Sequence, residues 1–248
     1  MPLPPSDRLD IEALSRLFDR TTNSYKYLFF LGLLDELQQR QFDAATPIPL
    51  KDVIVEMLAR AWRAHHTHHL KFGTQDQIVE KLNELDAALP KPLFRVKDVS
   101  PTDLRGMIRG RVADSTVELL RYVPFRLIRP FFEEELRGAR DAQVNQKILV
   151  LSQAEFETRK PLYTFTDDQQ AIILHPAWAT YLKENHAEVQ QWAFEAWVEY
   201  MERCNPGIDS IASKLPLTLL LLTLHTGGLS WQHHLTHLVS LLDSNIAS

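Results

Sequence analysis

The strongest pattern of apolar positions lies between Thr21 and Leu37 and predicts a helix at the centre of the fold. One helical face carries apolar residues at i, i+3, i+4, i+7 and i+10, namely Tyr27, Phe30, Leu31, Leu34 and Leu37. Much of the opposite face is apolar as well, with Leu28, Phe29 and Leu33. A helix that is hydrophobic on two sides is typical of a domain centre. Asn23 or Ser24 is placed to cap its N-terminus.

Further helical patterns follow one another along the chain, and prolines separate most of them. A capping box of Thr74 and Gln77 begins one helix, and Ser100 followed by proline begins another. The run Asn205-Pro206-Gly207 ends the aromatic-rich helix before it. The predicted helices cover residues 11–18, 50–61, 74–89, about 100–123, about 131–156 with a break near Gly138, 176–201, 217–225 and 231–242.

One pair of short segments predicts β-structure. Leu162 to Phe165 and Ala171 to Leu174 are rich in β-favouring residues, and the polar turn TDDQQ separates them. The expected fold class is therefore mainly α, a multi-helix domain with one short β-hairpin near residues 162–174. We divide the chain into a helical domain with the hairpin over residues 1–206 and a C-terminal apolar helical tail over residues 207–248.

Composition indicates a globular protein with its own core. Of the 248 residues, 45% are hydrophobic and 24% are charged, which disfavours disorder. The net charge of −5 means that any contact with nucleic acid depends on a local basic patch. Cys204 is the only cysteine and the first residues lack the pattern of a signal peptide, so we expect a cytoplasmic protein. The most apolar run, Leu215 to Leu224, is about half as long as a membrane span, so no membrane is expected.

Several catalytic patterns are absent from the sequence. It holds no G-x-G-x-x-G, no phosphate-binding loop ending in Gly-Lys-Ser/Thr and no G-x-S-x-G elbow. No acidic residue stands two positions before a lysine, as the acidic-x-Lys pattern of metal nucleases requires. We therefore assign no catalytic residue to this chain.

Two groups of histidines have the spacing of metal ligands but no acidic residue among them. His65 and His69 are four residues apart in HHTHH, and His233 and His237 are four apart in WQHHLTHL. The first group is better interpreted as an exposed helix end, where histidine is favourable near the negative end of the helix dipole. We assign no metal ligands, and the question of a metal at His65 to His69 stays open.

A run of arginines is the better candidate for function. Within 25 positions the chain carries six arginines and only two acids, Asp114 and Glu118. Planar guanidinium groups bind phosphate with two parallel hydrogen bonds, so this run predicts contacts to the DNA backbone. The alternative is a solvated helix face whose arginine stems cover apolar surface. The candidate DNA-binding residues are Arg105, Arg109, Arg111, Arg121, Arg126 and Arg129.

Five segments in a fixed order carry a resemblance to a known family. They are TTNSYKYLFFLGLLDEL from Thr21, AW…LKFGTQDQI over residues 61–78, PFRLIRPFF, PLYTF, and W…Y…RCNPGI over residues 197–208. In order and spacing they resemble the helical region upstream of the nuclease domain in a group of bacterial HNH-endonuclease-domain proteins. The resemblance spans about residues 21–208, which is most of the chain.

The resemblance implies a ββα-metal nuclease unit after this region, with a histidine base and a divalent cation. This chain departs from the family there, because no Asp-His or Glu-His pair followed by proline and asparagine comes after Pro206. No catalytic residue is carried over, and no cofactor is expected in this chain, with a divalent metal only where a nuclease domain is present elsewhere. The resemblance also implies a link to phage defence or mobile elements.

Three functions follow as hypotheses. The first is a non-catalytic DNA-binding or targeting region whose partners are DNA and a nuclease domain or subunit. The second is a helical protein–protein interaction module, which the aromatic-rich helix and the leucine-rich tail favour. In that tail, Leu215 to Leu224 holds more leucines than one helix face can bury, so another element of the chain or a partner must cover some of them. We expect a partner or self-association through the tail. The third is an active metal-dependent nuclease that uses His233, His234 and His237.

Overall fold

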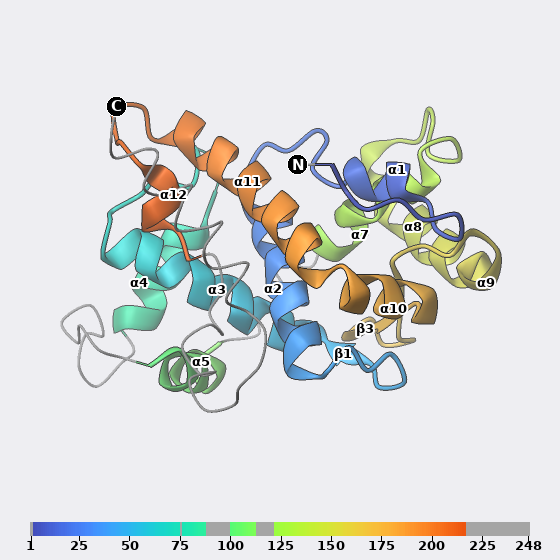
Figure 1. The fold of residues 1–248 in the computed structure, drawn as a ribbon, viewed down its shortest axis with the longest axis horizontal. Coiled ribbons are helices and arrows are strands. Elements are labelled where there is room, and N and C mark those ends of the chain that lie inside the picture. The colour runs from blue at the N-terminus through green and yellow to red at the C-terminus, as the bar shows by residue number, and fades with distance from the viewer. Residues whose placement is uncertain (1, 75, 88–99, 113–121, 217–248) are drawn as a thin grey trace.

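Helices dominate the part of the chain that the computed structural model describes, which comprises residues 2–74, 76–87, 100–112 and 122–216 (Figure 1). These residues form eleven α-helices, one 3-10 helix and three short strands, so the mainly helical fold class is confirmed. The helices are α1 (Ile11–Ser15), α2 (Tyr25–Gln39), α3 (Leu50–His66), α4 (Ile78–Ala87), α5 (Pro101–Arg109), α7 (Val123–Leu127), η2 (Arg129–Phe132), α8 (Asp141–Ala154), α9 (Phe156–Arg159), α10 (Pro176–Glu184), α11 (His186–Cys204) and α12 (Ile211–Lys214).

Helix α2 lies in the middle of the molecule, where it packs against α3, α7 and α11 (Figure 1). Apolar residues on both of its faces, among them Leu28 and Leu34, are fully buried, which confirms the predicted central helix. The N-cap is Ser24, but its hydroxyl and backbone N–H both donate to the carboxylate of Asp76 instead of capping the helix through its own side chain. Asn23 accepts a hydrogen bond from the backbone N–H of Tyr25.

Close packing of α2 on α3 depends on a glycine. A Cβ added to Gly32 would lie 3.1 Å from the carbonyl oxygen of Val53 and 3.2 Å from the backbone nitrogen of Met57. A larger residue at this position would push the two helices apart. The pair α2 and α3 therefore forms a tight platform from which the surrounding elements are positioned.

The sheet has three antiparallel strands in the order β1-β3-β2. Strands β2 (Tyr163–Phe165) and β3 (Ala171–Leu174) form the predicted hairpin, with Thr164 opposite Ile173. Strand β1 (Ile48–Pro49) pairs with the outer edge of β3, with Ile48 opposite Ile172. The sequence did not predict β1, because two residues that include a proline carry no alternating pattern.

Several predicted helix limits were wrong. Helix α5 ends at Arg109, where Gly110 is the C-cap, and does not continue to Val123. Helix α4 begins at Ile78, whose N–H is capped by the Asp76 carboxylate, so the predicted capping box of Thr74 does not form. Residues 88–99 and 113–121 lie outside the described ranges.

The predicted long helix over residues 176–201 is two helices, α10 and α11. Asn185 separates them, because its side-chain amide and its backbone N–H both donate to the carbonyl of Tyr181. Helix α11 ends at Cys204, as the Asn205-Pro206-Gly207 signal predicts. Asn205 then ties this end to the segment after α3, since its side chain accepts from Lys71 N–H and donates to the Lys71 carbonyl.

Beyond residue 206 the described chain continues as α12, which packs on α11 and buries Ile211. Leu215 is buried in the same core. The predicted helices over residues 217–225 and 231–242, and with them most of the leucine-rich run, lie outside the described residues. No helix in the described ranges is long and apolar enough to cross a membrane.

Candidate nucleic-acid interface

The two arginines of α5 face carboxylates of α3. Arg105 Nε lies 2.7 Å from a carboxylate oxygen of Glu56, and its side chain is only 12% exposed. Arg109 lies one turn further along α5 and pairs with Asp52 at 3.2 Å. Burial raises the pKa of Glu56, and the positive charge of Arg105 opposes that shift. The i, i+4 spacing does bring both arginines to one face, but that face is occupied by acids of the same chain.

Asp52 and Glu56 belong to a wider ion-pair network between α2 and α3. Arg40, the C-cap of α2, pairs with Glu36 of that helix at 2.6 Å and with Asp52 at 3.1 Å. Gln39 donates a hydrogen bond to Glu56. Because these carboxylates are already shared among several donors, the α5 arginines hold α5 against α3.

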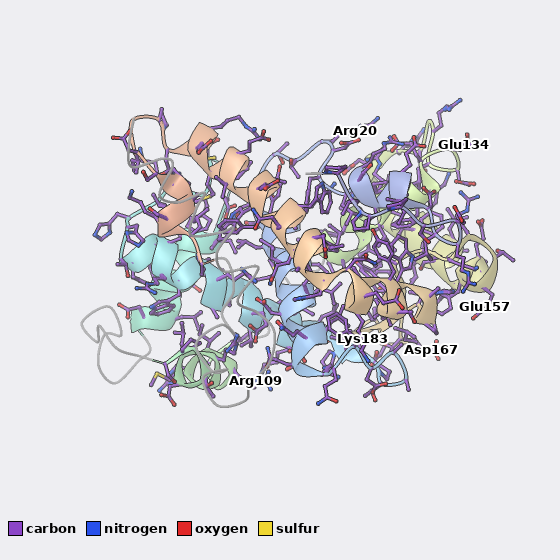
Figure 2. The ribbon with its side chains drawn as sticks, viewed as in Figure 1. Arg20, Arg109, Glu134, Glu157, Asp167 and Lys183 are labelled. Atoms are coloured by element: carbon purple, nitrogen blue, oxygen red, sulfur yellow. The ribbon has the colours of Figure 1, made fainter. Side chains whose placement is uncertain are left out.

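The other four predicted arginines do not lie on the α5 face that contacts α3. Arg111 follows the C-cap of α5, and Arg121 lies outside the described residues. Arg126 on α7 and Arg129 at the start of η2 line a cleft of about 330 Å³. Arg20, which lines the same cleft, lies at the opposite edge of the molecule from Arg109 (Figure 2). The arginine run therefore contributes to two separate places.

The cleft is positively charged. Its lining includes four cations, Arg20, Lys26, Arg126 and Arg129, which together we call the basic cleft, against two acids, Asp19 and Glu133. Both acids are paired with Arg16, which does not line the cleft, at 3.2 Å each. Glu133 also pairs with Arg20 at 3.0 Å.

Arg126 is partly neutralised, whereas Arg129 is not. Arg126 pairs with Asp141 at 2.7 Å and donates to the side-chain oxygen of Asn145. Within the described residues, the guanidinium of Arg129 makes no ion pair and no hydrogen bond, and its Nε is buried without a partner. Arg129 as a whole is half-buried and lines the cleft, so its guanidinium is placed to meet an external acceptor there.

Lys26 of α2 stands beside Arg129. Its ammonium donates to the backbone carbonyls of Leu17 and Asp19 at 3.1 and 3.0 Å, which fixes its position. The pKa of Lys26 is lowered to about 8, first by burial and next by the positive charge of Arg129. The negative charges of Asp19 and Glu133 offset only part of this effect, so the pair of cations favours the binding of an anion.

Sequence reasoning did not find Lys26 or Arg20. Lys26 sits inside the apolar run YKYLFF, where a single lysine carries no pattern, and Arg20 precedes the predicted helix by itself. The only available signal was that a lysine at the start of a helix buried on both faces must place its ammonium somewhere polar. Arg126 and Arg129, which line the cleft with it, come from more than 90 positions away in the sequence.

The histidines of HHTHH lie at and after the end of α3. His65 and His69 line a second cavity, and His65 Nε2 lies 2.9 Å from the side-chain oxygen of Asn83. His66 packs against Trp62, and burial followed by the charge of His65 lowers its pKa to about 4. Across the described ranges, no three side chains of His, Cys, Asp or Glu are placed to hold a metal ion. The tail histidines lie outside those ranges.

Comparison of this chain with protein-family models, with curated proteins and with solved structures finds no match. The geometry of the basic cleft and the resemblance described above are therefore the basis for a function.

Proposed function

We propose that this chain is a non-catalytic DNA-binding and targeting region of an HNH-endonuclease-like protein, and that its basic cleft holds a backbone phosphate. The observation that supports this most directly is the unpaired guanidinium of Arg129 beside the ammonium of Lys26. The resemblance supplies the remainder of the proposal: a nuclease domain or subunit as partner, and a role in phage defence or with mobile elements.

A phosphate fits the chemistry of the cleft. Arg129 offers planar N–H donors to two phosphate oxygens, and Lys26 adds a compact positive charge. A bound phosphate supplies a negative charge that favours the protonated form of Lys26 beside the guanidinium of Arg129. Arg20 and Arg126 already have acidic partners, so they add to the field of the cleft more than to direct contact.

The test is DNA binding measured by fluorescence anisotropy over a range of salt concentrations. With about 4 phosphate contacts, the log–log dependence of the affinity on salt should have a slope near −3 to −4. Replacing Arg129 by alanine should weaken binding by about tenfold at low salt and reduce the slope by about 1, because one charged hydrogen-bonded contact is lost.

Arg109→Ala is the matched control. It removes the same charge from a side chain that is half exposed but paired with Asp52 at the opposite edge of the molecule. We expect it to bind DNA like the unmodified chain. Equal loss in both variants would show that overall charge, and not the basic cleft, governs binding, and an affinity that does not depend on salt would refute the proposal.

The non-catalytic part of the proposal is tested separately with plasmid DNA and Mg²⁺, Mn²⁺ or Zn²⁺. We expect no nicking by the purified chain. Nicking that disappears when His233, His234 and His237 are replaced together by alanine would favour the active-nuclease hypothesis instead.

A further inference from the structure

A second cavity adjoins the basic cleft. It has a volume of about 640 Å³ and lies between the segment after α3 and the C-terminal end of α11. Thr22, an exposed residue just before α2, lines both this cavity and the basic cleft. The two hollows therefore share a lining residue, which makes them neighbours.

The second cavity carries its own cations. Lys71 and Arg203 line it, together with His65 and His69. Lys71 is exposed and has no ion pair within the described residues, while the Asn205 side chain holds its backbone on both sides. The side chain of Arg203 is 62% exposed, and its one acidic contact, to Glu199, is long at 4.0 Å. Its guanidinium lies over the ring of Tyr200.

Asp76, the acid that lines this cavity, already accepts hydrogen bonds from Ser24 and Ile78. One oxygen of Asp76 accepts from the backbone N–H of Ser24 at 2.8 Å and from the Ser24 hydroxyl, and the other accepts from the N–H of Ile78. Its charge is therefore directed at the start of α2 and α4. The cations on the wall, Lys71 and Arg203, have no comparable partner.

The cavity wall is fixed in place. The Tyr200 hydroxyl donates to the carbonyl of Phe72 at 2.8 Å and packs against Gly73, whose backbone has a φ of +114°. Asn205 makes the neighbouring pair of bonds to Lys71. Two independent tethers thus join α11 to the segment after α3, and they bring the backbone that carries Lys71 next to the end of α11 that carries Arg203.

We propose that this cavity is a second phosphate-binding site on the same nucleic-acid strand, so that the backbone runs from the basic cleft across Thr22 to Lys71 and Arg203. This inference rests on the proposed function and extends it from one phosphate contact to a track. Aromatic residues accompany the cations at both ends, with Tyr122 on the lining of the first hollow and Tyr200 on that of the second. Proteins that bind single strands without sequence preference use a cationic groove for the backbone and aromatic side chains for the bases.

The experiment compares short and long DNA on two double variants. Lys71→Ala with Arg203→Ala removes the cations of the second cavity, and Lys26→Met with Arg129→Ala removes those of the basic cleft. Single-stranded oligonucleotides of about 4 and about 16 nucleotides bracket the length that one groove contacts. A duplex of the longer length distinguishes paired from unpaired DNA as the source of the backbone. Lys183→Ala with Arg109→Ala, on α10 and α5, is the charge-matched control (Figure 2).

We expect the Lys71/Arg203 variant to bind the short oligonucleotide like the unmodified chain. On the long DNA it should lose about 2 from the magnitude of the log–log salt slope, because two phosphate contacts are removed. Thr22→Glu should weaken binding of the long DNA alone, since it places a negative charge where the two hollows meet. Melting temperatures of all variants verify that each is folded.

The outcomes separate this inference from the proposed function. A Lys71/Arg203 variant that matches the Lys183/Arg109 control on long DNA overturns the second site, while loss of binding in the Lys26/Arg129 variant leaves the proposed function intact. Loss only in the Lys71/Arg203 variant moves the binding site away from the basic cleft. Binding that is unchanged in both overturns both.

Discussion

Arg60 of α3 and Asp35 of α2 form a two-bond ion pair in the interior of the molecule. The Nε and Nη2 atoms of Arg60 each donate to one oxygen of Asp35 at 2.7 Å, and both side chains are 0% exposed. The third nitrogen, Nη1, donates to the carbonyl of Pro216 at 2.8 Å. Because two charges are costly to bury, such a pair is stable only when its hydrogen bonds are complete. It links α2, α3 and the chain that follows α12.

Replacing Arg60 by methionine should lower the free energy of unfolding by about 3–5 kcal/mol, because it leaves the Asp35 carboxylate buried without a partner. Urea denaturation followed by circular dichroism measures the effect. The double variant Asp35→Leu with Arg60→Met removes both charges and should be more stable than the single variant. If the double variant is the less stable of the two, the pair is not the source of the loss.

Most of the helices could be predicted from the sequence, because apolar spacing and helix-ending residues are local patterns. The two-sided apolar pattern over Thr21 to Leu37 required burial on both faces, and Asn205-Pro206-Gly207 could not continue a helix. The break at Asn185 was not accessible, because it arises when the side-chain amide competes for the Tyr181 carbonyl. Strand β1 exists only because the edge of β3 pairs with it, which is a tertiary effect.

Only part of the candidate site could be predicted from the sequence. Arginines that are close in sequence are expected to be close in space only along one element, and the run here spans α5, α7 and η2. Arg105 turned inward because Glu56, almost 50 positions earlier, is a buried carboxylate that requires a cation. Such pairing between distant elements has no signature in local spacing. Arg129 and Lys26 line the same cleft because α2 packs on α7 and η2 follows α7, which local spacing does not show either.

Gly73 and Tyr200 provide a second test of the packing between α11 and the segment after α3. Gly73→Ala should lower stability by about 1–3 kcal/mol, because its φ of +114° strains a residue with a side chain. The new Cβ would also lie 2.4 Å from the Tyr200 hydroxyl oxygen. Thermal unfolding measured by calorimetry reports the loss.

A double-mutant cycle isolates the steric part of that loss. Tyr200→Phe removes the hydroxyl, so the combined variant should be more stable than the sum of the two single changes predicts. Gly106→Ala is the control, because nothing lies within 4 Å of its added Cβ on α5 and alanine favours a helix. Strict additivity of the Gly73 and Tyr200 changes would contradict the contact.

His66 should make the fold sensitive to acid. Its pKa in the folded chain is lowered to about 4, chiefly by burial, whereas an unfolded histidine takes up a proton near pH 6.5. Between these values the unfolded chain binds more protons, so stability falls as the pH drops from about 6.5 to about 4. Urea midpoints measured at intervals across that range should decrease more steeply for the unmodified chain than for His66→Gln. Parallel curves would assign the acid sensitivity to other groups.

Lys26 should give DNA binding a dependence on alkaline pH. A lysine in water keeps its charge to about pH 10.4, but burial and Arg129 lower the pKa of Lys26 to about 8. The basic cleft of the free chain therefore loses one positive charge as the pH rises through about 8. The affinity for DNA should decrease between pH 7 and pH 9, and the log–log salt slope should decrease in magnitude by about 1.

The lowered pKa of Lys26 couples both DNA binding and folding stability to proton uptake. A phosphate beside Lys26 favours the protonated form, so binding at pH 8 should take up protons, and calorimetry in buffers of different ionisation enthalpy detects that uptake. In the absence of DNA the folded chain binds fewer protons than the unfolded chain between about pH 8 and pH 10.5, so stability should rise with pH across that window. DNA binding and stability thus change in opposite directions.

Two variants of Lys26 test this assignment. Lys26→Arg keeps its charge at every pH tested, so it should retain DNA affinity without the decrease at alkaline pH. Lys26→Met should bind DNA weakly at pH 7, and its affinity should change little by pH 9. A Lys26→Met variant that still shows the full decrease would place the titrating group outside the basic cleft.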